Sequence, residues 1–156
     1  MKAVVLDGSR AGDVAGERIG QATLAVLAAQ GWQVEAFLLR EAKIGNCAGD
    51  FFCWVRTPGQ CMLDDDNRTV AAAIANADLL VCLTPITFGG YSSALKRQID
   101  HQIQSISPFF AQVAGETHHQ RRYERYPNLL VIGRQERPDP DAAAVCRLAT
   151  RTEGAR

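Results

Sequence analysis

The chain has 156 residues, which is enough for one domain with an ordinary hydrophobic core and leaves little room for two. Its 17 Lys and Arg residues balance 17 Asp and Glu residues, so the protein has no net charge that would attract a nucleic acid or a membrane surface. No apolar run approaches the roughly 18 residues of a membrane span, and the N-terminus lacks the apolar region of a signal peptide. We therefore expect a single cytoplasmic domain, residues 1–156, whose five cysteines serve metal, redox or core roles in preference to structural disulfides.

Apolar runs and helical spacing alternate along the chain. Short apolar runs predict strands at residues 2–7, 32–39, 78–84 and 128–133, and the first of them is expected to be a buried parallel strand. Apolar residues at helical spacing predict helices at about residues 16–30, 66–77, 92–106 and 140–152. The connecting segments 40–64 and 107–127 are expected to be irregular.

This alternation predicts a doubly wound α/β fold, with a parallel sheet, right-handed crossovers and helices on both faces. A five-stranded version would need one more strand after the last helix, and the sequence stops at Arg156. We expect either a sheet that lacks the fifth strand, or an edge completed by further chain or by a partner. Ligands of such sheets bind beyond the carboxyl ends of the strands, where the strand order switches. The expected ligand site is therefore the loops at residues 8–16 and 85–92, with residues 134–139 nearby.

The first of these loops joins a strand to a helix N-terminus. Glycine-rich turns at such a place present backbone N–H groups and a helix dipole to an anion. Ser9 and Arg10 add a hydroxyl and a cation, which favours a phosphate site. Asp13 and Glu17, however, place negative charge where a phosphate would bind, so a plain strand-to-helix turn is the alternative.

The second loop, TPITFGGYSS at residues 84–93, follows the most apolar of the predicted strands. It combines hydroxyl groups, two glycines and two aromatic side chains. This composition suits a flat, partly polar ring, because aromatic side chains can cover its face and backbone groups can reach its edge. A glycine-rich turn with aromatic residues in the core is the alternative.

Three cysteines, Cys47, Cys53 and Cys61, lie on the connection at residues 40–64. Structural zinc and iron–sulfur clusters normally take four ligands, so Asp50 would have to serve as the fourth. A redox-active or structural disulfide is a second interpretation, since spacing alone does not establish contact. The third is that the cysteines pack as small apolar residues, and we assign no metal ligands.

Two adjacent histidines, His118 and His119, precede Arg121, Arg122 and Arg125 in the segment expected to be irregular. Two histidines without a third ligand are weak evidence for a metal. A solvated basic loop is the simplest interpretation. The functional alternatives are an oligomer contact and the recognition of a pyridine nucleotide's phosphates by arginine.

Three segments carry a family resemblance: VVLDGSR at residues 4–10, CAGDFFCW at residues 47–54 with PGQC at residues 58–61, and TPITFGGYSSALK at residues 84–96, continuing through Asp100. On these segments the chain resembles the NAD(P)H-dependent FMN reductases of the flavodoxin superfamily, particularly the branch that includes iron–sulfur flavoproteins. The resemblance covers about residues 1–133.

The resemblance implies a flavodoxin-like fold, FMN as cofactor and NADH or NADPH as co-substrate. Ser9 and Arg10 would bind the phosphate, together with the loop backbone. It also implies a homodimer or homotetramer, and transfer of hydride or electrons to a quinone-like, metal or protein acceptor. Because the flavin carries this chemistry, we assign no acid–base residue. The residues expected to line the isoalloxazine ring are Pro85, Ile86, Thr87, Phe88 and Gly89.

The sequence also departs from the family's pattern. The segment DVAGE at residues 13–17 stands where the family's phosphate loop is rich in Ser and Thr. Asp50 stands where the iron–sulfur branch has a cysteine, and His101 stands where an arginine commonly follows the aspartate. A four-thiolate cluster is therefore excluded. These departures support an alternative in which the fold is kept and flavin binding is lost. The chain would then act as a subunit or binding module through residues 107–127 and the exposed sheet edge, and a cysteine-based redox carrier is a third hypothesis.

Overall fold

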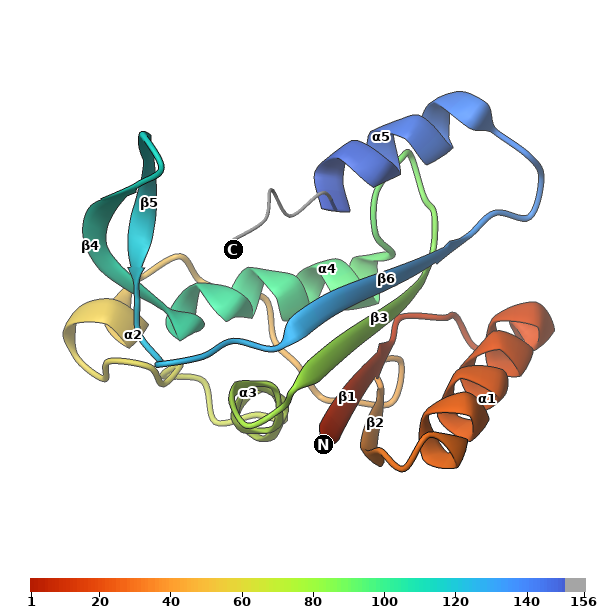
Figure 1. The fold of residues 1–156 in the computed structure, drawn as a ribbon, viewed down its shortest axis with the longest axis horizontal. Helices are drawn as coiled ribbons and strands as arrows, with labels where there is room; N and C mark the ends of the chain where they lie inside the picture. The colour runs from red at the N-terminus through yellow and green to blue at the C-terminus, as the bar shows by residue number, and fades with distance from the viewer. Residues whose placement is uncertain (151–156) are drawn as a thin grey trace.

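The computed structural model describes the backbone of residues 1–150 and the side chains of residues 1–148. Its centre is a parallel sheet of four strands in the order β2-β1-β3-β6 (Figure 1). This sheet confirms the predicted doubly wound, flavodoxin-like fold. The strands, each close to its predicted place, are β1 (Lys2–Asp7), β2 (Gln33–Leu38), β3 (Leu79–Pro85) and β6 (Asn128–Arg134).

Helices cover both faces of the sheet, as the alternation predicts. On one face α1 (Val14–Ala29) packs through Leu27 against a cluster that contains Val5 and Val81. On the other face α3 (Asn67–Ala75) and α4 (Ser93–Asp100) pack against Val4 and Leu6. Within the described residues, no helix is both long and apolar enough to cross a bilayer.

The strand register brings the loops after β1 and β3 together. Asp7 at the end of β1 lies opposite Leu83 of β3, and the Gly8 N–H donates to the Leu83 carbonyl at 2.8 Å. The connection after β1 runs to β2 on one side of β1, and the connection after β2 crosses to β3 on the other side, so the strand order switches between β1 and β3. The crevice at this switch is where open α/β sheets bind ligands.

The last helix, α5 (Pro140–Thr150), lies beyond the carboxyl ends of the strands and not on a face of the sheet (Figure 1). It packs beside the loop after β3, where its Val145 contacts Gly89. The rest of the predicted helix, residues 151–152, lies outside the described residues. Because of this placement, α5 forms part of the wall of the crevice.

The expectation that residues 107–127 are irregular is wrong for most of that segment. It contains an antiparallel hairpin of β4 (Ile106–Val113) and β5 (Glu116–Arg121), which stands away from the main sheet (Figure 1). Ala114 and Gly115 join the strands, both with positive φ, as in the two-residue turns that suit hairpins. Pro108 argues against a strand in the sequence because proline is uncommon inside strands. In the structure it lies where the register of the hairpin shifts, between Ile106 and Phe110.

The long connection at residues 40–64 is irregular apart from one short helix, α2 (Phe52–Val55). It is held against η1 (His101–Ser105), a 3₁₀ turn that replaces the predicted last turn of α4. The Trp54 indole donates to the Ile103 carbonyl at 2.8 Å, and the buried His101 ring contacts the Gly45 carbonyl at 2.9 Å through Nε2. The cysteine-bearing connection is therefore a packed part of the structure.

Candidate functional site

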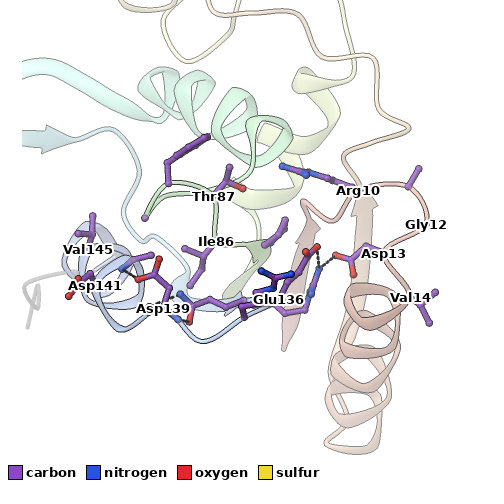
Figure 2. Close-up of a pocket in the computed structure, with 18 residues that line it drawn as sticks. Arg10, Gly12, Asp13, Val14, Ile86, Thr87, Glu136, Asp139, Asp141 and Val145 are labelled. Carbon is purple, nitrogen blue, oxygen red and sulfur yellow. Dashed lines mark hydrogen bonds and ion pairs between the residues drawn. The ribbon is translucent and has the colours of Figure 1, made fainter.

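A pocket of about 1010 Å³ lies at the predicted crevice. This volume is at the upper end of the range for small-molecule and cofactor sites, about 300–1,000 Å³. The loop after β1 forms one side of the pocket, α5 forms the opposite side, and the loop after β3 lies between them (Figure 2). The segment after β6, at residues 134–139, contributes the floor between the first loop and α5. All three loops that the sequence nominated thus line one cavity.

The loop after β3 ends in a tight turn that faces the pocket. Thr87 and Gly90 exchange backbone hydrogen bonds at 3.0 and 2.9 Å, so Phe88 and Gly89 form the tip between them. Both have positive φ, 51° for Phe88 and 74° for Gly89. A bulky residue rarely adopts this conformation, and such strain concentrates at ligand sites. The Phe88 side chain is fully exposed, so it is available to cover a ligand.

The base of the same loop is fixed from both neighbouring elements. The Ile86 N–H donates to the Arg134 carbonyl at 2.8 Å, which continues the pairing of β3 with β6. The Ser92 N–H donates to the Thr84 hydroxyl at 2.8 Å, and the Ser92 hydroxyl caps α4 by accepting from the Leu95 N–H. These contacts hold the tip of the loop at the edge of the cavity.

The opposite end of the pocket is organised around Asp13, the residue that caps α1. Its Oδ1 accepts a hydrogen bond from the Gly16 N–H at 2.9 Å. Its Oδ2 forms an ion pair with Nη2 of Arg134, which comes from the end of β6 (Figure 2). The side chains of both residues are mostly buried, with exposed fractions of 10% and 16%.

The protonation of Asp13 is set by these contacts. Burial opposes ionisation of the carboxyl group, but the Gly16 hydrogen bond, the Arg134 guanidinium and the charge of Arg10 together outweigh it. They hold the pKa of Asp13 below its usual value. The helix N-terminus therefore already carries a fixed negative charge that belongs to the protein.

The structure brings six of the seven nominated cofactor-binding residues to the wall of the pocket: Arg10, Pro85, Ile86, Thr87, Phe88 and Gly89. Ser9 is not among the residues that line it. Ser9 is buried, and its N–H donates to the Asp7 carboxylate at 2.8 Å. Glu17, which the sequence raised as a second obstacle to phosphate, also lies away from this pocket and approaches Arg40 at 3.9 Å.

The sequence placed residues 134–139 near the site, but it did not identify Arg134 as the partner of Asp13, and it did not assign α5 to the site. Arg134 pairs with Asp13 from 121 positions away, and no local pattern signals such a contact. Val145 belongs to a helix whose spacing predicts an apolar face but not what that face contacts. Only the topology placed residues 134–139 near the pocket, because they follow a strand whose carboxyl end lies at the same edge of the sheet as those of β1 and β3.

The three cysteines of the long connection lie outside the pocket as free thiols. The interpretation of a disulfide among them is therefore not supported. Burial raises the pKa of the Cys53 thiol, and electrostatic repulsion from the neighbouring Cys61, Cys47 and Asp50 adds to this effect. Asp50 is engaged in the start of α2, where its carboxylate accepts from the Phe52 N–H at 2.9 Å. Among the residues that the structure describes, no group of three or more His, Cys, Asp or Glu side chains is arranged to hold a metal.

The two histidines of the hairpin face different neighbours. His118 pairs with Glu116 at 2.9 Å on the exposed side. His119 contacts the Ser107 carbonyl through Nδ1 at 2.7 Å, and its ring lies 5.4 Å from that of Trp54. His119 thus joins the hairpin to α2. The interpretation of this segment as a solvated basic loop did not predict such a packed histidine.

Comparison with known proteins identifies relatives of this arrangement. A model of the family described as NADPH-dependent FMN reductase matches residues 1–119. No curated protein sequence matches the chain significantly.

Two solved structures align with parts of the chain. The crystal structure of RosB with a bound 8-demethyl-8-formylriboflavin-5′-phosphate intermediate aligns with a TM-score of 0.57 and 19% identity, over 85% of this chain and 52% of that one. An apo form of the NADH:FMN oxidoreductase EMOB aligns with a TM-score of 0.44 and 22% identity, over 67% of this chain and 52% of that one. The aligned part thus spans about half of each neighbour.

Proposed function

Because the chain belongs to the NADPH-dependent FMN reductase family, we propose that it is a flavin-dependent oxidoreductase that uses this pocket. It would pass hydride or electrons from NADH or NADPH, through FMN, to a quinone-like, metal or protein acceptor. The observation that carries the proposal is the loop after β3. Its strained tip, at Phe88 and Gly89, forms part of the wall of a cofactor-sized cavity at the switch point of the sheet.

The half of the pocket near α5 fits an isoalloxazine ring. Ile86 and Val145 supply apolar surface there, Phe88 supplies an exposed aromatic face, and the backbone of Thr87 and Gly89 lies at the rim. Aromatic faces and backbone edges are the groups that a flat, partly polar ring needs. When bound, FMN supplies the redox chemistry, and the protein's part is to hold and orient it.

The half of the pocket near α1 fits the phosphate less well. Arg10 and Arg134 would be the groups that hold it, together with the start of α1. Asp13, however, already pairs with Arg134, and the charge of Arg10 also acts on it. This observation favours a second candidate, a binding module that has kept the fold without flavin.

A homodimer or homotetramer is part of the proposal. Apolar side chains are exposed on the hairpin at Phe109 and Phe110, and on the edge strand β6 at Leu129 and Leu130. An unpaired edge strand with apolar side chains needs a cover in a stable protein. Sedimentation velocity would measure the oligomeric state directly.

An absorption spectrum tests the redox proposal against the binding module. The protein would be purified without added cofactor, incubated with FMN and passed through gel filtration under anaerobic conditions. We expect flavin absorption to stay with the protein and to bleach on addition of NADPH or NADH. A colourless protein that retains no flavin would instead favour the binding module. The next experiment would then be a search for molecules that bind the hairpin at residues 106–121.

A further inference from the structure

Several backbone donors of the loop after β1 are used within the protein. The Ser9 N–H binds the Asp7 carboxylate, the Asp13 N–H binds the Arg10 carbonyl at 3.2 Å, and the Val14 N–H binds the Gly12 carbonyl at 3.0 Å. A loop that cradles a phosphate presents such donors outward to the anion. In this loop several of the N–H groups already have acceptors within the protein and are not available to a ligand.

The start of α1 is similarly occupied. The Gly16 N–H, one of the free donors of a helix N-terminus, binds the Asp13 carboxylate. The space between them is closed, because a Cβ on Gly16 would lie 2.6 Å from Ser9 Oγ and 2.7 Å from Asp13 Oδ2. A phosphate group has no room at this position unless Asp13 moves.

The charges that line the pocket do not compensate for this. Three guanidinium groups are present, but four carboxylates lie among them, so the wall carries no excess of positive charge for a dianion. Arg134 is moreover committed to Asp13, and its Nε is buried without a hydrogen-bond partner among the described residues. The charged residues of the wall are Arg10, Arg134, Arg137, Asp13, Glu136, Asp139 and Asp141.

We propose that Asp13 is a specificity-determining residue that acts as an internal substitute for the ligand's phosphate, so that the pocket binds riboflavin at least as tightly as FMN. The inference rests on the proposed function, since it requires a flavin in the pocket. The carboxylate of Asp13 fills the anion position at the start of α1 and neutralises Arg134. The ribityl chain of riboflavin ends in a neutral hydroxyl group, which can lie beside this pair without charge repulsion. FMN brings two further negative charges to the same place.

The test is a titration of the flavin-free protein with FMN and, separately, with riboflavin, followed by the quenching of flavin fluorescence. Asp13→Asn removes the charge and keeps a side chain that caps helices as well as Asp does, so α1 should be preserved. Glu17→Gln is the matched control, because it removes the same charge from the first turn of the same helix but faces Arg40. Circular dichroism would check that each variant is folded.

We expect the wild-type protein to bind riboflavin with an equal or lower Kd than FMN. In Asp13→Asn, the Kd for FMN should fall at least about tenfold relative to that for riboflavin, which corresponds to about 1.4 kcal/mol. In Glu17→Gln the ratio of the two Kd values should stay as in the wild type.

Two results would overturn the assignment of Asp13 and leave the flavin function intact. One is tighter binding of FMN than of riboflavin by the wild-type protein. The other is an Asp13→Asn variant in which the ratio of the two Kd values is unchanged. Failure of every variant to bind either flavin would remove the proposed function together with this inference.

Discussion

Gly89 lies against Val145 so closely that a Cβ at position 89 would be 3.0 Å from both Cβ and Cγ1 of Val145. The tip of the loop after β3 thus packs beside α5, and an added Cβ at position 89 would come closer to Val145 than ordinary van der Waals contact allows. Gly89 also has a φ of 74°, which a residue with a Cβ rarely adopts. The positive φ and the proximity to Val145 therefore each require glycine at position 89. A side chain at this position would disturb the wall of the pocket.

Gly89→Ala should lower the free energy of unfolding by more than its backbone cost alone. The left-handed conformation costs an alanine about 1–2 kcal/mol, and the collision with Val145 adds to it. Gly115→Ala is the matched control, since Gly115 has a φ of 86° and nothing lies within 4 Å of its missing Cβ. Urea denaturation would compare the two variants. Equal losses of stability would show that the contact with Val145 is loose, whereas partial rescue by Val145→Ala would support it.

Phe88 offers a different test, because its exposed ring contributes little to folding. Phe88→Ala should change the free energy of unfolding by less than about 0.5 kcal/mol. It should raise the Kd for flavin roughly threefold to tenfold, since a ring contact is worth about 0.5–1.5 kcal/mol. Phe109→Ala removes an exposed ring from the hairpin, away from the pocket, and should leave flavin binding unchanged. An unchanged Kd in Phe88→Ala would remove this side chain from the ring site.

The sheet and the position of the pocket could be predicted from the sequence because they depend on local patterns. The two central strands, β1 and β3, are short buried apolar runs, and β-α alternation leaves few ways to arrange the four strands. The loops at the carboxyl ends of β1 and β3 follow from that arrangement. For this reason the sequence predicts that residues as separate as Arg10 and Gly89 lie at one pocket. Assignment of residues 1–156 to one domain stays a prediction.

The features that were missed depend on contacts between distant segments. Pro108 and the polar composition of β5 concealed the hairpin, since neither is typical of a strand. The position of α5 follows from its packing on Gly89, and its own spacing does not specify that partner. Asp13 was recognised as an obstacle to phosphate, but its pairing with Arg134 across 121 residues could not be derived from spacing.

The cysteines should differ strongly in reactivity. Cys47 is exposed, whereas burial raises the pKa of Cys82 to about 12 and also raises the pKa of Cys53. Since the thiolate is the reacting form, iodoacetamide at pH 8 should modify Cys47 first, Cys53 more slowly and Cys82 only after unfolding. Peptide mass spectrometry over a time course would give the three rates. Modification of Cys82 at the rate of Cys47 in the folded protein would contradict its burial.

Asp13 should make the stability of the fold depend on acid. Its pKa in the folded state lies below the unfolded value of about 3.9, so the ionised carboxylate stabilises the fold at pH values above that. This contribution is lost as the pH falls through the folded-state pKa, where protonation ends the ion pair with Arg134. The wild type should therefore be more stable than Asp13→Asn at pH 7, and the difference should disappear at the lowest pH at which both still fold. Urea denaturation across this range measures the difference directly, and titrations of the other carboxylates cancel in it. A difference that stays constant with pH would mean that Asp13 contributes through packing and not through its charge.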